Sequence, residues 1–139
     1  GSKSNLISKI ESIKGVLNLG GILPAVDQIL IDRGDLSREV SIDKIPFIQR
    51  RIISFAKSKD VPVFVATNLL ESMIKTISPT RAEVNDVAST LLMGASGLVL
   101  AAETAIGSHP VEAVNMICSL IKQYERWTPE STFSDIFYN

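Results

Sequence analysis

The chain has 139 residues, of which 45% are hydrophobic and 21% charged, and its formal net charge is −1. This balance is typical of an ordinary globular domain, and we expect neither a nucleic-acid nor a membrane partner. No apolar run reaches the ~18 residues of a membrane span, and no signal peptide is expected. Cys118 is the only cysteine, so no internal disulfide can form, and we expect a cytoplasmic or another reducing compartment.

The first half of the chain predicts two units in which a strand precedes a helix. Leu6–Ile10 is the first strand, and the short helical pattern Ile13–Leu19 follows it, stopped by Gly20-Gly21. Gln28–Asp32 is the second strand. Ile45-Pro46 then opens a helix with proline in its first turn, and its apolar positions recur at helical spacing.

The second half predicts two more units of the same kind. Val61–Ala66 is a strand, and Thr80 with Glu83 forms a capping-box pattern at the start of the next helix. Ser96–Ala101 is the fourth strand. Pro110 opens the last helix, whose predicted core positions are Val111, Val114, Ile117, Cys118 and Ile121. Cys118 is therefore expected to fill the core rather than to react.

Four strand-then-helix units predict an α/β fold with a parallel sheet. The periodicity leaves two architectures open, an open doubly wound sheet and one half of an eight-stranded barrel. Residues 1–126 form the predicted domain. Residues 127–139 are polar and aromatic without a period, which leaves either a tail docked on the surface or a linker.

Polar residues follow the strands at the end where parallel α/β folds gather ligands. Lys9 and Glu11 share one face of their strand, and Asp35 comes soon after the next strand. Carboxylates suit magnesium, and lysine suits phosphate, so this pattern favours a metal site beside an anionic ligand. The alternative is structural: a surface ion pair between Lys9 and Glu11, and an ordinary turn at Gly34.

Five segments resemble motifs of the pyruvate kinase family, in the same order and spacing from residue 6 to about residue 125. Each motif alone is weak, whereas five in register are specific. The resemblance implies the fifth to eighth units of that family's (β/α)8 barrel. The segments are Ser8–Glu11, Asp32–Leu36, Ala66–Met73, Pro79–Ala88 and Glu103–Val114.

The resemblance also implies roles for individual residues. Lys9 matches the lysine that steadies the transferred phosphoryl group, and Thr67 matches the threonine near the enolate carbon; both are expected to be catalytic. Glu11 and Asp35 match the ligands of a catalytic Mg²⁺ or Mn²⁺. Gly34 and Asp35 match positions whose backbone amides hold the substrate carboxylate, and Arg33 is also expected to bind substrate. The family's potassium site lies outside this chain.

The chain departs from the family pattern at several of these motifs. Asp32 replaces the alanine before Arg-Gly-Asp, which adds negative charge close to the expected substrate carboxylate. Ala101 replaces a serine, so a hydroxyl expected to help deliver a proton is missing. Ile106 replaces a lysine on the nucleotide side, and Asn68 replaces a glutamine.

Three functions remain open at this point. The chain belongs to an inactive relative that serves as a structural or regulatory module, to an active pyruvate kinase, or to a related enzyme acting on another phosphoenol or oxo-acid substrate. We expect no turnover from this chain alone, because the family's first four strands are absent. Four strands leave two open sheet edges, so we expect self-association or pairing with a separate half-barrel.

Overall fold

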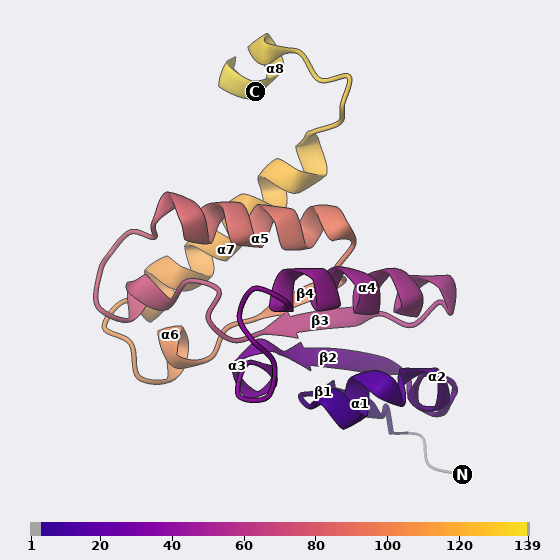
Figure 1. The fold of residues 1–139 in the computed structure, drawn as a ribbon. Helices are drawn as coiled ribbons and strands as arrows, with labels where there is room; N and C mark the ends of the chain where they lie inside the picture. The colour runs from indigo at the N-terminus through magenta and orange to yellow at the C-terminus, as the bar shows by residue number, and fades with distance from the viewer. Residues whose placement is uncertain (1–3, 139) are drawn as a thin grey trace.

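The computed structural model describes residues 4–138, which form one parallel sheet with helices packed against it (Figure 1). The strands are β1 (Ile7–Ile10), β2 (Gln28–Asp32), β3 (Val63–Ala66) and β4 (Gly97–Val99). The helices are α1 (Ile13–Leu17), α2 (Leu19–Ile22), α3 (Arg33–Leu36), α4 (Ile45–Ser58), α5 (Arg81–Met93), α6 (Ala102–Ala105), α7 (Pro110–Arg126) and α8 (Phe133–Tyr138), with short 3-10 turns η1 (Leu23–Ala25) and η2 (Glu71–Ile74).

The strand order decides between the two architectures left open by the sequence. The strands pair in the order β1-β2-β3-β4, and every pair is parallel. Crossovers between parallel strands are right-handed, so a sheet without a reversal of order carries its helices on one face. A doubly wound sheet needs such a reversal to place helices on both faces. The structure therefore confirms a half-barrel and excludes the open doubly wound sheet.

The two faces of the sheet differ in burial, as a half-barrel requires. Ile10, Ile31 and Val65 are neighbours in register and are fully buried under the helices. The alternate row contains Lys9, Leu30 and Phe64, which point to the opposite, open face. Lys9 is exposed, and Leu30 and Phe64 are only partly buried. The metal-ligand and phosphate-binding candidates on β1 therefore lie on the face that a closed barrel would enclose.

Two of the predicted helix starts are confirmed in detail. Thr80 accepts a hydrogen bond from the Glu83 amide and Glu83 accepts one from the Thr80 amide, so α5 begins with a complete capping box. Pro46 and Pro110 lie in the first turns of α4 and α7, where the missing N–H has no helical partner to lose.

Gly20-Gly21 does not stop a helix, contrary to the prediction. The break falls at Asn18, which ends α1 and precedes α2, and the two glycines lie inside α2. Glycine disfavours a helix by only about 1 kcal/mol. The neighbouring Leu19 and Leu23 are buried, and their burial offsets that cost.

Cys118 is exposed, so its predicted place in the core is wrong. Helix α7 carries two apolar stripes. One contains Ala113 and Ile117, which pack into a core cluster with α5 and η2. The other contains Val111, Val114 and Cys118, and no element of residues 4–138 buries it. Periodicity finds apolar stripes, but it does not tell which of them has a partner.

The segment after α7 holds the short helix α8, which the lack of periodicity in residues 127–139 did not predict. In Figure 1 this helix stands away from the sheet at the end of an extended connection. Its aromatic side chains Phe133, Phe137 and Tyr138 are exposed. Among residues 4–138 no helix has the length and apolarity to cross a bilayer.

Candidate functional site

A lysine and three carboxylates meet at the carboxyl ends of β1 and β2. The Lys9 ammonium lies 3.1 Å from a Glu11 oxygen, 3.4 Å from an Asp32 oxygen and 4.0 Å from an Asp35 oxygen. One oxygen from each carboxylate lies within 4.8 Å of the others. The structure thus brings together Lys9, Glu11 and Asp35 as the sequence predicted, and it adds Asp32.

These groups are in place because of strand geometry. Lys9 and Glu11 are two residues apart, so their side chains project from the same face of the sheet. Lys9 is paired in register with Leu30 of β2, and Asp32 lies two residues beyond Leu30 on the same face. Asp35 follows in the first turn of α3, which begins directly at the end of β2.

The charges within the cluster shift one another's pKa values. Hydrogen bonds to Glu11 and then to Asp32 raise the pKa of Lys9. Partial burial alone would raise the pKa of Asp32, but hydrogen bonds from Asp35 and Lys9 outweigh burial and lower it. The Asp32 carboxylate in turn raises the pKa of Asp35. Asp32 is therefore held as the anion that Lys9 neutralises.

The carboxylates have the chemistry and spacing of a divalent-cation site. Two oxygens on opposite sides of one ion are about 4.2 Å apart for Mg²⁺ and about 4.6 to 5.2 Å apart for Ca²⁺. The 4.8 Å spread among Glu11, Asp32 and Asp35 is close to these values. The Glu11 side chain is 43% exposed, so it has room to move closer to the other two carboxylates when an ion binds. The residues thus fit a cation with oxygen ligands.

Thr67 follows β3 in an unusual backbone conformation. Its φ is 71°, and the next residue, Asn68, has a φ of 57°. A β-branched residue rarely adopts positive φ, and such strain persists only where the surroundings enforce it. The Thr67 hydroxyl accepts a hydrogen bond of 2.6 Å from the Gly34 amide, which fixes it beside Asp32.

Arg33 holds the other side of Thr67. Its guanidinium donates hydrogen bonds of 2.9 and 3.2 Å to the Thr67 carbonyl, and one of 2.8 Å to Asp86 of α5. The Arg33 side chain is only 11% exposed. The structure thus directs Arg33 to the backbone and to α5, while the open face of the sheet holds Lys9. Its predicted contact with substrate stays a prediction, and its observed contacts are those of a positioning residue.

A cavity of about 320 Å³ lies next to the cluster. Its wall includes Asp32, Gly34, Asp35, Thr67 and Asn68 on one side and Ala101, Ala102 and Glu103 on the other. The volume is at the low end for small-molecule sites. The predicted site residues other than Lys9, Glu11 and Arg33 all line this cavity.

Glu103 is a buried structural residue that the sequence did not distinguish from its neighbours. It is 1% exposed, and its two oxygens accept hydrogen bonds from the Leu70 and Ala101 amides at 3.0 and 3.1 Å. It therefore ties the loop after β3 to the end of β4. A glutamate directly after a short apolar strand was the available signal, but sequence alone does not reveal which amides it meets.

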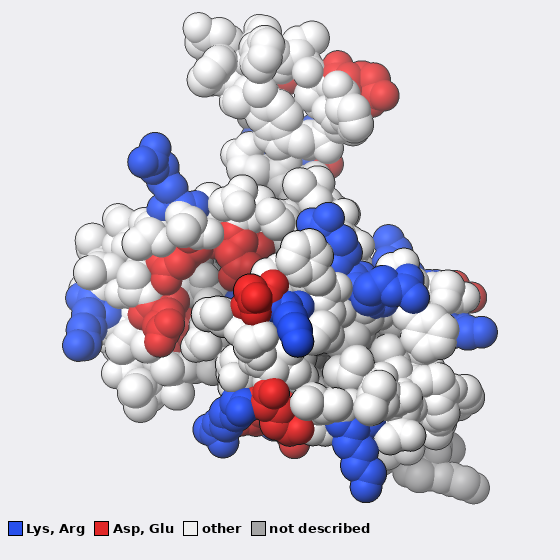
Figure 2. Space-filling view, viewed as in Figure 1, with Lys and Arg blue, Asp and Glu red and all other residues white. Residues whose placement is uncertain are grey.

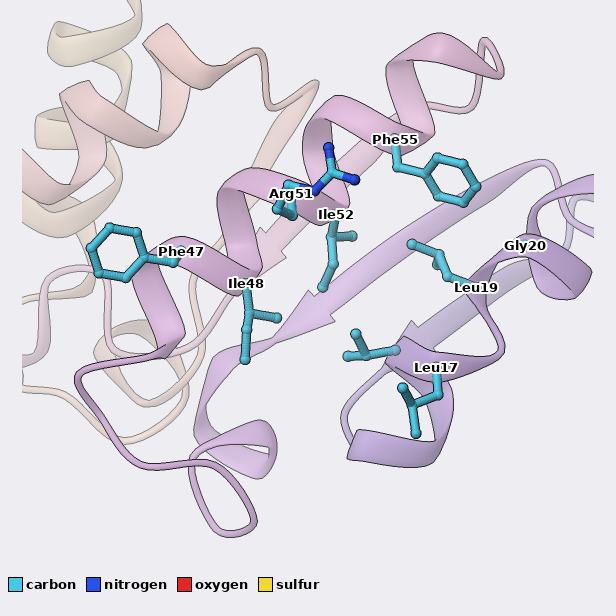
Figure 3. A pocket seen from close by; sticks show the side chains of 9 residues that line it. Leu17, Leu19, Gly20, Phe47, Ile48, Arg51, Ile52 and Phe55 are labelled. Carbon is cyan, nitrogen blue, oxygen red and sulfur yellow. The ribbon is translucent and has the colours of Figure 1, made fainter.

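A second cavity, of about 510 Å³, lies on the helical side between α4 and the α1–α2 region (Figure 3). Phe47, Ile48 and Phe55 of α4 line it together with Leu17 and Leu19. Among residues 4–138, Arg51 is the only charged residue in its wall, and the wall contains no carboxylate, histidine or cysteine. The candidate site is therefore the smaller cavity.

The surface charge is mixed rather than uniform. Figure 2 shows acidic side chains mainly on the side of α3 and the loop after β3, and basic side chains mainly over α4. The acidic side contains the cluster and the smaller cavity. A local acidic patch of this kind favours cations.

Known proteins resemble this chain throughout most of its length. Residues 1–114 match the family model of the pyruvate kinase barrel domain. The chain belongs to the pyruvate kinase family. A pyruvate kinase of Thermotoga maritima is 44% identical over 91% of this chain, and one of Dictyostelium discoideum is 40% identical over 99%. The crystal structure of a Cryptosporidium parvum pyruvate kinase superposes with a TM-score of 0.89 at 41% identity, over 92% of this chain.

The match covers a limited part of each relative. The chain spans 27% of the two pyruvate kinases compared by sequence and 26% of the Cryptosporidium parvum chain. It is therefore a pyruvate kinase barrel-domain segment, and the resemblance predicted from five motifs is confirmed. Most of what a whole pyruvate kinase contains lies outside these residues.

Three of the four departures from the family pattern, Asp32, Asn68 and Ala101, line the smaller cavity. Asp32 joins the acidic cluster, Ala101 lies in the wall, and Ile106 is 78% exposed just after α6. Asn68 lines the cavity with positive φ, which asparagine adopts more readily than most residues. The substitutions therefore change the polar groups at the cavity without changing the strands that support them.

Proposed function

We propose that this chain supplies the divalent-cation and phosphoryl-binding corner of a pyruvate-kinase-type barrel, does not complete an active site by itself, and serves as a structural or regulatory module of a larger protein. The observation that carries the proposal is the meeting of Lys9 with Glu11, Asp32 and Asp35 at one end of the sheet. The retained cluster supports ion binding, and the incomplete barrel supports the lack of turnover.

The chemistry of the corner suits phosphoryl transfer, in which positioning and charge neutralisation dominate. Glu11 and Asp35 would hold Mg²⁺ or Mn²⁺, which would neutralise charge on the phosphoryl and enolate oxygens. Lys9 would place its ammonium against the same anion. Thr67, fixed by Gly34 and Arg33, would present its hydroxyl toward the ligand.

Metal binding is tested by titrating Mn²⁺ into the wild type and Asp35→Ala. We expect weak binding by the wild type, because two or three protein oxygens leave several positions to water, and at least a fivefold loss in the variant. Asp43→Ala is a matched control, since Asp43 is exposed and lies outside the cluster. Equal affinity of the wild type and Asp35→Ala would contradict the proposed site.

Turnover is tested separately with phosphoenolpyruvate and ADP in an assay coupled to lactate dehydrogenase. We expect no pyruvate from this chain alone, because the residues of the first four family strands are missing and Ala101 and Ile106 replace a hydroxyl and an ammonium. Turnover that survives repurification and is lost in Lys9→Met would contradict this expectation.

The retained Lys9, Glu11, Asp35 and Thr67 favour a second candidate, in which the chain is one segment of an active phosphotransferase. Its substrate would be phosphoenolpyruvate or another phosphoenol or oxo acid. The same assay on the full-length parent distinguishes the candidates. Activity of the parent that Lys9→Met abolishes would support the active enzyme over the inactive module.

A further inference from the structure

Asp32 fills a niche that has the donors of a carboxylate site. One Asp32 oxygen accepts a hydrogen bond from the Asp35 amide at 3.1 Å and lies 3.4 Å from the Thr67 hydroxyl. The other oxygen lies 3.4 Å from the Lys9 ammonium. The Asp35 amide and the Lys9 ammonium, from two separate segments, thus converge on one carboxylate, whose side chain is 11% exposed. The Thr67 hydroxyl lies beside it and makes its shorter hydrogen bond, 2.7 Å, to the Ala66 carbonyl.

These contacts already use the backbone amides that a second carboxylate would need at the same place. The Asp35 amide donates to Asp32, and the Gly34 amide beside it donates to Thr67. Any external carboxylate would also meet the negative charges of Asp32 and Asp35. Both amides that the family resemblance assigns to substrate are therefore already engaged by side chains of this chain.

We propose that Asp32 is a specificity-determining residue, whose carboxylate occupies this niche and so keeps small carboxylate ligands away from the metal corner. The inference rests on the proposed function, because it concerns the ligand admitted at that corner. The niche opens into the cavity of about 320 Å³, whose wall includes Asp32 itself. Shortening this side chain would therefore enlarge a cavity that is already accessible.

The principal test is the affinity for pyruvate, the probe carboxylate, measured by calorimetry with Mn²⁺ present. In Asp32→Ala the Asp35 amide loses its acceptor, and the Lys9 ammonium keeps only Glu11 and Asp35 as ion-pair partners. We expect this variant to bind pyruvate at least tenfold more tightly than the wild type. Equal affinity in both proteins, or no detectable binding by either, would overturn the proposal.

Asp32→Asn is the matched variant, because it keeps the volume and one acceptor oxygen but removes the charge. We expect its pyruvate affinity to stay within about threefold of the wild type, since the niche remains filled. An Asn variant that binds as tightly as Asp32→Ala would overturn the proposal, because charge alone would then exclude the ligand. Circular dichroism of each variant checks that the fold is retained.

The Mn²⁺ titration and the pyruvate measurement can fail independently, so the Asp32 proposal and the proposed function are tested separately. The metal-binding proposal fails when the wild type and Asp35→Ala bind Mn²⁺ equally. The Asp32 proposal fails when Asp32→Ala gains no affinity for pyruvate, whatever the outcome of the Mn²⁺ titration. An Asp32→Ala variant that gains pyruvate affinity while binding Mn²⁺ two- to tenfold more weakly would support both.

Discussion

At the scale of single residues, one side chain holds a strained part of the backbone in place. That side chain is Arg33, which bonds the carbonyl of Thr67, a residue with a φ of 71°. Hydrogen bonds that involve a charged group are worth more than neutral ones, and an unsatisfied buried partner is costly. A side chain outside the cluster of Lys9, Glu11, Asp32 and Asp35 therefore helps to determine where Thr67 lies.

Replacing Arg33 with methionine should lower the free energy of unfolding by about 2 kcal/mol, because the Thr67 carbonyl loses two charged donors. Urea denaturation measures the change. Arg38→Met is the control, since Arg38 is 81% exposed and its ion pair with Asp35 should contribute less than about 1 kcal/mol. Equal destabilisation by both substitutions would contradict the role assigned to Arg33.

Glu83 should make stability depend on acid pH. Burial alone would raise its pKa above the ordinary 4.5, but hydrogen bonds from Ser72 and Thr80 outweigh burial and lower it. A lowered pKa stabilises the fold fully above pH 4.5, and this contribution disappears as pH falls through the folded-state pKa. The stability difference between wild type and Glu83→Gln should therefore shrink below pH 4.5.

Thermal or urea unfolding between neutral and acid pH measures this difference. Glu125→Gln is a suitable control, because Glu125 is exposed on α7 and its side chain has no hydrogen bond or ion pair among residues 4–138. A difference for Glu83→Gln that stays constant through the acid range would count against the carboxylate as its source.

At the scale of elements, the glycines have different roles according to their backbone conformation. Gly94 ends α5 with a φ of 107°, a conformation in which a side chain is strained. Gly20 lies within α2 with no atom within 4 Å of where a Cβ would stand. The same residue type is thus required at one helix and replaceable at another.

Gly94→Ala should lower the free energy of unfolding by about 1 to 2 kcal/mol, mainly through the positive φ. The Lys57 side chain near the added Cβ is flexible enough to move. Gly20→Ala should raise it by about 0.5 to 1 kcal/mol, because alanine reduces the freedom of the unfolded chain. Chemical denaturation of both variants tests the contrast, and a loss at Gly20 equal to that at Gly94 would refute it.

At the scale of the whole molecule, the sheet has two unpaired edges. Strands β1 and β4 each pair with one neighbour among residues 4–138, and four strands are half of a closed barrel. Apolar side chains such as Ile7 and Val99 are exposed at these strands. Open edges and exposed apolar surface favour association. Self-association, or pairing with a separate half-barrel, stays a prediction.

We expect the mass measured by light scattering to rise with protein concentration, as two copies pair through their open edges. Ile7→Lys should shift the equilibrium toward the monomer, because it places a charge on the open side of β1. Leu17→Lys is the control, since Leu17 is 78% exposed on helix α1 and is not a residue of the edge strand. A monomeric mass at every concentration would eliminate the paired arrangement.

The sequence by itself determined the four strands, the starts of the long helices and the family, because each depends on local patterns or on motifs in register. It also predicted that Lys9, Glu11 and Asp35 would meet, since parallel strands end at a common edge. Periodicity left the half-barrel and the open sheet undecided; the family resemblance implied the half-barrel, and the order of the strands confirmed it. The tertiary structure alone placed Asp32 in the niche, engaged Arg33 with Thr67, and left Cys118 on an uncovered stripe. These outcomes depend on contacts between segments far apart in the chain, which local periodicity does not encode.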